Sequence, residues 1–245
     1  MLIAIHQPHY VPWLGYLDRM AKADLFIVLD HVQFERRNFQ NRTTIRLEGQ
    51  PKLLTVPVVQ LSQKETIVEK MIDNSADGGR DWGPTHFKTL RYAYRKAPFF
   101  AQYAPRLEEI LCAKWDKLVD LDLAMLDFVR DAFEIRTPLR RSSEMKVEGA
   151  KSELLLNLCK ALGPGATFLG GMGGSRRYLD HEAFAREGVG VQWQEFKHPE
   201  YAQCGEGAFI PGLMSLDLLF NCGPQGRDVL WQRTQSTDQD ERLAA

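Results

Sequence analysis

The sequence predicts an α/β fold built around a mainly parallel sheet, and three observations support this. Apolar runs of strand length at 3–6 and 25–30 flank an amphipathic helical pattern at 14–22, which indicates a β-α-β unit with a parallel strand pair. Helical periodicity dominates from 86 to 133, and strand and helix patterns alternate again after 138. We therefore expect a Rossmann-like N-terminal β-α-β unit, a helical middle section and a further α/β C-terminal part.

The other elements follow from periodicity and from residues that break it. β-Branched residues on either side of a turn at 48–51 predict a hairpin of 43–47 with 52–59. Pro98 and the pair 115–116 divide the helical section. The elements expected after the hairpin are helices at 86–94, 99–112 and 117–133, a strand at 138–141, a helix at 151–162, and strands at 166–169 and 190–196.

The domain organisation expected from these patterns is simple. Residues 1–224 form a single α/β catalytic domain with a helical insertion around 84–134. The last segment, 225–245, is rich in Gln, Asp, Arg and Thr and is expected to be a flexible tail.

Composition sets limits on the class of protein. The 245 residues are 44% hydrophobic and carry a net charge of −1, which allows a large core and gives no general attraction to nucleic acid or anionic membranes. No apolar run approaches the roughly 18–20 residues of a membrane-spanning helix, and no signal peptide is visible, which favours a cytoplasmic protein. The four cysteines form no C-x-x-C pair, so no metal site is expected, and only Cys204, in a polar loop, is a weak nucleophile candidate.

The clearest functional signal lies where the first strand ends. An apolar run there leads directly into polar and aromatic side chains, namely His6, Gln7, His9, Tyr10, Trp13 and Tyr16. The second strand ends in the same way at Asp30 and Gln33, and parallel strand ends meet at one edge of a sheet, where ligands bind. The alternative is an ordinary strand–turn–helix junction whose histidines cap or pack, and both interpretations remain open.

Two further segments carry polar groups of functional interest. The stretch 35–42 has three arginines among amides, including Asn41 and Arg42, and is either a solvated loop or a clamp for phosphate or carboxylate. The glycine-rich stretch 170–175 can expose backbone N–H groups to an anion, although it lacks the lysine and spacing of a P-loop.

Several blocks of the sequence together carry a family resemblance. They are 5–16, 23–34, 40–42, 151–153, the glycine-rich stretch from 170 through 180, 193–199 and 215–221. In these blocks the chain resembles the WbqC-like protein family. The resemblance implies a cytoplasmic transferase of surface-polysaccharide or related biosynthesis that acts on an activated sugar, an acyl or aminoacyl group, or a carrier-bound intermediate.

The leading hypothesis is transfer of an acyl or aminoacyl group to an amine or hydroxyl of a sugar-like acceptor, such as a nucleotide sugar. The donor would be held on phosphopantetheine, and an acyl carrier protein is a possible partner. His9 or His6 is the candidate general base, because the ordinary pKa of histidine is near neutrality. Asp30 would orient a histidine or a ligand hydroxyl, and Gln7, Gln33 and Asn41 would orient the substrate. Arg42, with Arg36 or Arg37, would bind a phosphate. His198 and Asp217, although distant in the sequence, are expected to fold back onto the site and contact the substrate.

Two alternatives come from other observations. The first β-α-β unit is similar to the start of HxGH nucleotidylyltransferases and of pantothenate synthetase, which hold ATP there, although Trp13 and Tyr16 replace the histidines of those enzymes. This implies nucleotidyl transfer or ATP-dependent ligation, with Mg²⁺ held by Asp30. The second alternative is a non-catalytic adaptor that binds a carrier protein through a basic helical face at Lys88 and Arg91.

Overall fold

The computed structural model describes residues 1–75, 81–171 and 173–231. Its centre is a five-stranded sheet in the order β5-β2-β1-β6-β7, in which every pairing is parallel. The strands are β1 (Leu2–His6), β2 (Leu25–Val28), β5 (Leu139–Arg141), β6 (Thr167–Gly170) and β7 (Gly190–Trp193). Counted along the chain, this is the order 3-2-1-4-5 of a Rossmann-like sheet, so the predicted fold class is confirmed.

The strands are continuously apolar because both faces of the sheet are covered. Successive side chains of a strand point to opposite faces. Ala4 and Phe26 therefore lie in one hydrophobic core, whereas Ile3, Ile5 and Ile27 lie in the other. Two of the predicted strands, 25–30 and 190–196, end earlier, at Val28 and Trp193. The N–H groups of Leu29 and Gln194 still donate to the carbonyls of His6 and Gly170 in the neighbouring strands, and the residues after them lie outside the sheet.

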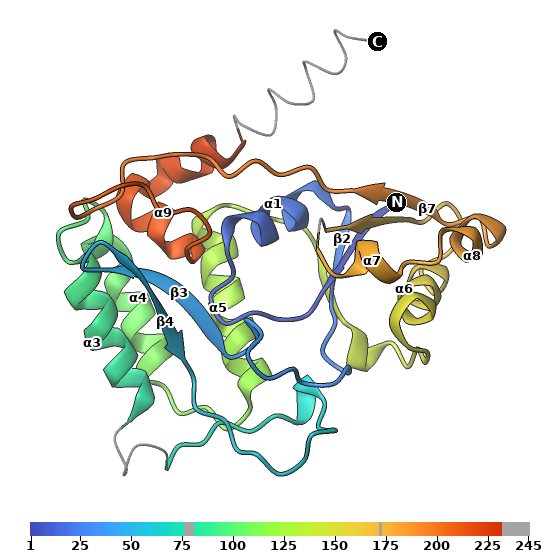
Figure 1. Cartoon of the computed structure of the whole chain (residues 1–245), viewed down its shortest axis with the longest axis horizontal. Coiled ribbons are helices and arrows are strands. Elements are labelled where there is room, and N and C mark those ends of the chain that lie inside the picture. The colour runs from blue at the N-terminus through green and yellow to red at the C-terminus, as the bar shows by residue number, and fades with distance from the viewer. Residues whose placement is uncertain (76–80, 172, 232–245) are drawn as a thin grey trace, which may run out of the picture.

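Helices cover the two faces unequally (Figure 1). One core contains the buried faces of α1 (Leu14–Lys22), α5 (Leu118–Ala132) and α9 (Ser215–Cys222), together with α3 (Trp82–Tyr94) and α4 (Phe100–Cys112). The other core contains α6 (Lys151–Lys160) and α8 (His181–Arg186), preceded by the short α7 (Ser175–Tyr178). The predicted helical section is therefore present, but α3 begins at Trp82 rather than at 86. Pro84 lies in its first turn, where a missing N–H costs no intrahelical hydrogen bond.

The hairpin lies outside the main sheet. It consists of β3 (Arg42–Leu47) and β4 (Gln50–Thr55), which pair antiparallel. Glu48 and Gly49 have φ values of 52° and 73°, as a two-residue type I′ turn requires. The turn is thus shorter than predicted, and β4 begins two residues earlier. Figure 1 shows the hairpin beside α3 and α4, on the opposite side of the molecule from α6 and α8.

Short elements complete the described chain. Three turns of 3₁₀ helix occur at Ile67–Glu69, Ser142–Glu144 and Gly223–Gln225. The predicted tail starts too early at 225, because residues 226–231 are helical and the side chain of Leu230 is buried in the first core. Residues 232–245 lie outside the described part of the chain. Within the described part, every helix is too short or too polar to cross a bilayer.

Candidate functional site

A cleft of about 340 Å³ opens at the carboxyl edge of the sheet, beside the ends of β1 and β6. The strand order reverses here, because the chain proceeds from β1 to β2 in one direction and from β6 to β7 in the other. Crevices at this point of an open α/β sheet are the usual ligand sites. Polar residues of the lining come from β1, α1 and the loop after β2: His6, Gln7, His9, Arg19, Glu35 and Asn38. Gly171, Gly174 and Tyr178 close the other side.

Three rings form a cluster at the β1 side of the cleft. The ring centroid of His6 lies 4.6 Å from that of His9 and 4.8 Å from that of Tyr16, and the His9 and Tyr16 centroids are 5.3 Å apart. Nδ1 of His6 lies 2.8 Å from the carbonyl oxygen of Gln7. A carbonyl oxygen only accepts, so Nδ1 of His6 carries a proton, and Nε2 keeps its lone pair when the ring is neutral.

His9 has different properties from His6. Its side chain is buried, and its Nδ1 has no hydrogen-bond partner among the described residues. Burial lowers the pKa of His9 to about 4, which keeps the ring neutral at physiological pH and makes it a weak base. Of the two histidines that the sequence offered as general base, the geometry therefore favours His6.

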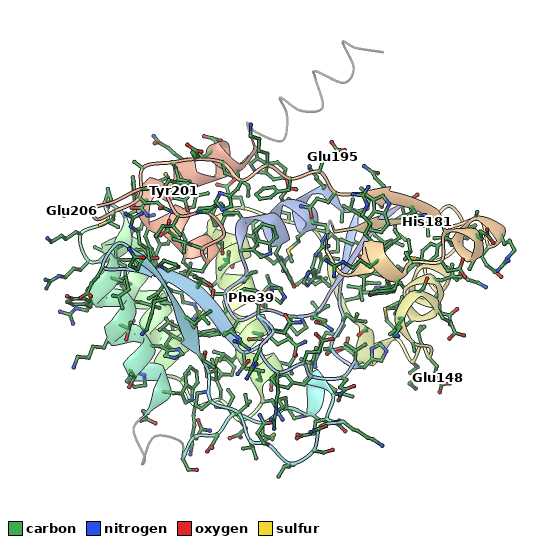
Figure 2. The ribbon with its side chains drawn as sticks, viewed as in Figure 1. Phe39, Glu148, His181, Glu195, Tyr201 and Glu206 are labelled. Atoms are coloured by element: carbon green, nitrogen blue, oxygen red, sulfur yellow. The ribbon has the colours of Figure 1, made fainter. Side chains whose placement is uncertain are left out.

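His9 also separates the cleft from a second cavity. This cavity has a volume of about 110 Å³ and a mostly apolar lining that includes Val11, Trp13, Phe39 and Met214. Phe39 lies at the centre of the molecule, between the hairpin and the sheet (Figure 2). The cleft, whose lining is mixed polar and apolar, and the small apolar cavity therefore share His9 as a lining residue.

The turn after β1 is stiff, as its two prolines predict. Val11, directly before Pro12, has a φ of 50°, which a β-branched residue rarely adopts. The strain is held by hydrogen bonds on both sides, because the N–H of Tyr10 donates to the carbonyl of Phe39 and the hydroxyl of Thr43 donates to the carbonyl of Val11. Such strain is typical of backbone near functional sites.

Gln7 is positioned by a residue that the sequence analysis did not select. Nε2 of Gln40 donates to Oε1 of Gln7 at 2.9 Å, and Oε1 of Gln40 accepts from the backbone N–H of Glu35. The buried Gln40 thus fixes the loop after β2 against the end of β1. Its only sequence signal was its place within the amide-rich stretch 35–42.

Arg19 is the second residue that sequence reasoning did not find. It lies on α1, lines the cleft and is 6% exposed. A Cβ atom at Gly171 would lie 2.2 Å from Nη1 of Arg19, so a larger residue at 171 would displace this guanidinium from its present position. The sequence gives no hint of this contact, because Arg19 reads as one polar residue of an amphipathic helix.

Of the nine predicted ligand-binding residues only Gln7 lines the cleft, and four of the other eight bond other parts of the fold. The hydroxyl of Tyr10 bonds Nδ1 of His86 at 2.9 Å, deep in the core. Asn41 donates to the carbonyl of Val56, which holds the end of the hairpin. The remaining two also bond backbone carbonyls, Arg42 that of Asn38 and Gln33 that of Gln63.

Trp13 borders the second cavity rather than the cleft. Its indole ring packs edge-on against Phe196, with the ring centroids 5.5 Å apart. The ring also covers Gly15, where a Cβ atom would lie 2.2 Å from it. Gly15 is thus a packing requirement of Trp13, in the place where the similarity to ATP-binding enzymes expected a phosphate.

Asp30 fixes the ends of two strands together. Its buried carboxylate accepts hydrogen bonds from Nε of Arg141, from the hydroxyl of Ser142, and from both the hydroxyl and the N–H of Ser143. These donors occupy both oxygens and join the end of β2 to the turn after β5. The carboxylate does not line the cleft, and it is not free to orient a histidine or hold a metal. Across the described ranges, no three side chains of the metal-binding types gather into a site.

His198 and Asp217 lie near each other but not at the cleft. The carboxylate of Asp217 accepts from the hydroxyls of Tyr94 and Tyr201 at 2.9 and 2.7 Å. His198 stacks on Tyr201, and burial lowers the pKa of His198. Figure 2 shows Tyr201 beside α9, on the hairpin side of the molecule, where the segment after β7 has crossed from the sheet edge. Cys204 follows in this segment and is half-buried.

Comparison with known proteins agrees with the sequence blocks described above. The model of the WbqC-like protein family matches residues 7–229. A curated protein of Mycobacterium tuberculosis (strain ATCC 25618 / H37Rv), the uncharacterized protein Rv1507c, is 33% identical over 231 residues, which are 93% of this chain and 96% of that protein. No solved structure matches the chain. The family model covers the cleft lining from Gln7 onward and the C-terminal helices, and the chain therefore belongs to the WbqC-like protein family.

Proposed function

We propose that this chain is a transferase of surface-polysaccharide or related biosynthesis. It moves an acyl or aminoacyl group to an amine or hydroxyl of a sugar-like acceptor. The observation that carries the proposal is the state of His6, whose Nδ1 donates to the carbonyl of Gln7 and whose Nε2 is left as a proton acceptor in a substrate-sized cleft.

The proposed reaction is a single acyl transfer. Nε2 of His6 accepts the proton of the acceptor amine or hydroxyl as its nitrogen or oxygen attacks the acyl carbonyl carbon. A new C–N or C–O bond forms, the C–S bond of a thioester donor breaks, and His6 returns the proton to the leaving thiolate. Gln7, held by Gln40, is placed to bond a polar group of the substrate in the same cleft.

The second cavity supports acyl chemistry over the alternatives. It offers a small apolar volume behind His9, beside Trp13 and Phe39, which fits a short acyl chain better than a phosphate or a base. A phosphopantetheine thioester is the donor we propose, presented free or on an acyl carrier protein. The exposed basic residues Lys88 and Arg91 of α3 remain a candidate surface for such an acidic carrier.

Two observations make ATP-dependent chemistry a weaker proposal than acyl transfer. Asp30, its proposed metal ligand, already accepts four hydrogen bonds. Trp13 covers Gly15, in the turn to which the similarity to those enzymes assigns ATP. The adaptor hypothesis differs from both enzymatic hypotheses because it predicts carrier binding without turnover.

The test is release of free thiol from short acyl and glycyl pantetheine thioesters, measured with a panel of amino sugars and nucleotide sugars as acceptors. We expect acceptor-dependent release by the wild-type chain and a loss of about 10²–10⁴-fold in rate for His6→Gln, the usual value of a general base. His181→Gln, an exposed histidine of α8, is the matched control and should keep the full rate. Full activity of a folded His6→Gln variant would refute the assignment of His6, and release with Mg-ATP alone would favour ligation.

A further inference from the structure

Among the described residues, the buried cation Arg19 has no hydrogen-bond or ion-pair partner. Its side chain is 6% exposed, and within the described ranges no hydrogen bond or ion pair of its guanidinium occurs. Burial lowers the pKa of Arg19 to about 10, so the group is still charged at neutral pH. Removing an unpaired charge from water costs several kcal/mol.

Arg46 has a guanidinium as buried as that of Arg19, and its hydrogen bonds give it a structural role. Arg46 is 3% exposed, and its two Nη atoms donate to Oε1 of Gln203 and to the carbonyls of Glu206 and Ala208 at 2.6–2.9 Å. Every one of these acceptors belongs to the segment that crosses from β7 to the hairpin. Arg19 has no comparable set, so its position is not explained by structure alone.

The surroundings of Arg19 leave space for an acceptor from outside the chain. Arg19 lies in the wall of the 340 Å³ cleft, against Gly171. Gly174, in the same lining, has nothing within 4 Å of the place where a Cβ would be. The acid of the lining, Glu35, accepts instead from the amide of Asn38 at 3.0 Å. The cleft therefore has an unused cation and room beside it.

We propose that Arg19 binds an oxyanion of the substrate, a phosphoryl or carboxylate group, in the same cleft as His6. The planar guanidinium bonds either group with two parallel N–H donors, and in a site shielded from water such a bond is strong. The inference deepens the proposed function, on which it rests for the identity of the cleft as the substrate site. The substrate class becomes an anionic sugar derivative or an anionic donor, with the charged group held at Arg19 and the reacting group at His6.

Binding of simple oxyanions tests this without any turnover. The full chain is titrated with inorganic phosphate, pyrophosphate or acetate at ionic strength matched with sodium chloride, and both the affinity and the thermal midpoint are recorded. We expect saturable stabilisation of the wild-type chain. Arg19→Met should weaken the affinity roughly tenfold or more and should raise the midpoint in the absence of oxyanion, because it removes a buried unpaired charge.

Two further variants make the test specific. Arg106→Met removes an arginine of α4 whose side chain is 57% exposed, and it should leave both quantities at wild-type values. Arg19→Lys keeps the charge without the planar fork and should bind more weakly than the wild type but more tightly than Arg19→Met. A preference for phosphate or pyrophosphate over acetate would identify the group as phosphoryl, and the reverse as carboxylate.

The outcomes separate this inference from the transferase proposal. The oxyanion site is refuted if none of the anions stabilises the wild-type chain, or if both Arg19 variants keep the wild-type affinity. A lower midpoint of Arg19→Met with unchanged affinity would make Arg19 a structural residue. His6→Gln should retain oxyanion affinity, so intact binding without any thiol release would overturn only the proposed reaction.

Discussion

At the scale of single residues, the least compensated group in the core is the carboxyl of Asp122 on α5. It is 1% exposed, and neither oxygen has a hydrogen-bond partner among the described residues. Burial raises the pKa of Asp122 well above its ordinary value, which favours the neutral acid. Burial, and after it the nearby carboxyl of Asp122, raise the pKa of Tyr10 and Tyr16. The ring of Tyr16 in turn contacts both histidines of the cleft. The core behind the cleft therefore contains an acid whose pKa is raised by burial.

We predict that Asp122→Asn stabilises the chain, and increasingly so as the pH rises. A carboxyl whose pKa is raised in the folded state favours folding only below its unfolded pKa, which is 3.8 here, and that advantage is lost at higher pH. The difference in free energy of unfolding between variant and wild type should grow by about 1.4 kcal/mol per pH unit above pH 4, until the pKa of the folded carboxyl is reached. Urea unfolding at several pH values measures it. A difference that does not change with pH would show that Asp122 has a compensating partner.

At the scale of elements, Asp30 connects the ends of β2 and β5. The sequence predicted an apolar strand that ends at Asp30, and a catalytic role was inferred from that position, whereas β2 ends two residues earlier, at Val28. The donors from Arg141, Ser142 and Ser143 lie more than 110 positions away along the chain. No local pattern reveals them, so the assigned role could not be tested before the fold was known.

We predict that Asp30→Asn destabilises the chain by about 2–4 kcal/mol, because one side-chain oxygen becomes an amide that faces buried donors. Asp127→Asn is the control, since Asp127 pairs with Arg130 on the surface and is 63% exposed. That change should cost at most about 0.5 kcal/mol. Chemical denaturation gives both values, and thiol release by the remaining folded protein gives the second readout. Wild-type stability of Asp30→Asn combined with lost activity would restore the catalytic interpretation.

At the scale of the whole molecule, patterns that depend on near neighbours predicted well. The parallel sheet, the helical section and the cluster at the end of β1 follow from strand-length apolar runs and helical periodicity. Arg19 and Gly171, which are in contact, lie 152 positions apart, and no local sequence pattern indicates this contact. Asp122 was predictable in part. It lies on the same face of α5 as the buried residues Leu118, Met125 and Val129, whereas Asp120 lies on the exposed face. The helical periodicity predicts that position 122 is buried, but it does not predict that the pKa of its carboxyl is raised.

We expect the helical section and the sheet to be parts of one folding unit, because single strands supply both cores. Ala4 packs into the core that contains α3, α4 and α5, whereas its neighbours Ile3 and Ile5 pack against α6. Loss of either core removes one face of β1 from its contacts and so weakens the other core. Chains of this length often unfold through intermediates, so a single cooperative transition is a specific expectation of this arrangement.

We predict that two tryptophans in different parts of the fold unfold together. Trp82 lies in α3, and Trp193 lies in β7 at the far edge of the sheet. The native ¹⁹F resonances of 5-fluorotryptophan at these sites, assigned with Trp82→Phe and Trp193→Phe, should lose intensity at the same urea concentration. Leu107→Ala, which opens the core under α4, should lower both midpoints equally, as should Leu158→Ala on α6. If Leu107→Ala lowered only the midpoint of Trp82, the helical section would be a domain of its own, and the cleft would belong to the sheet alone.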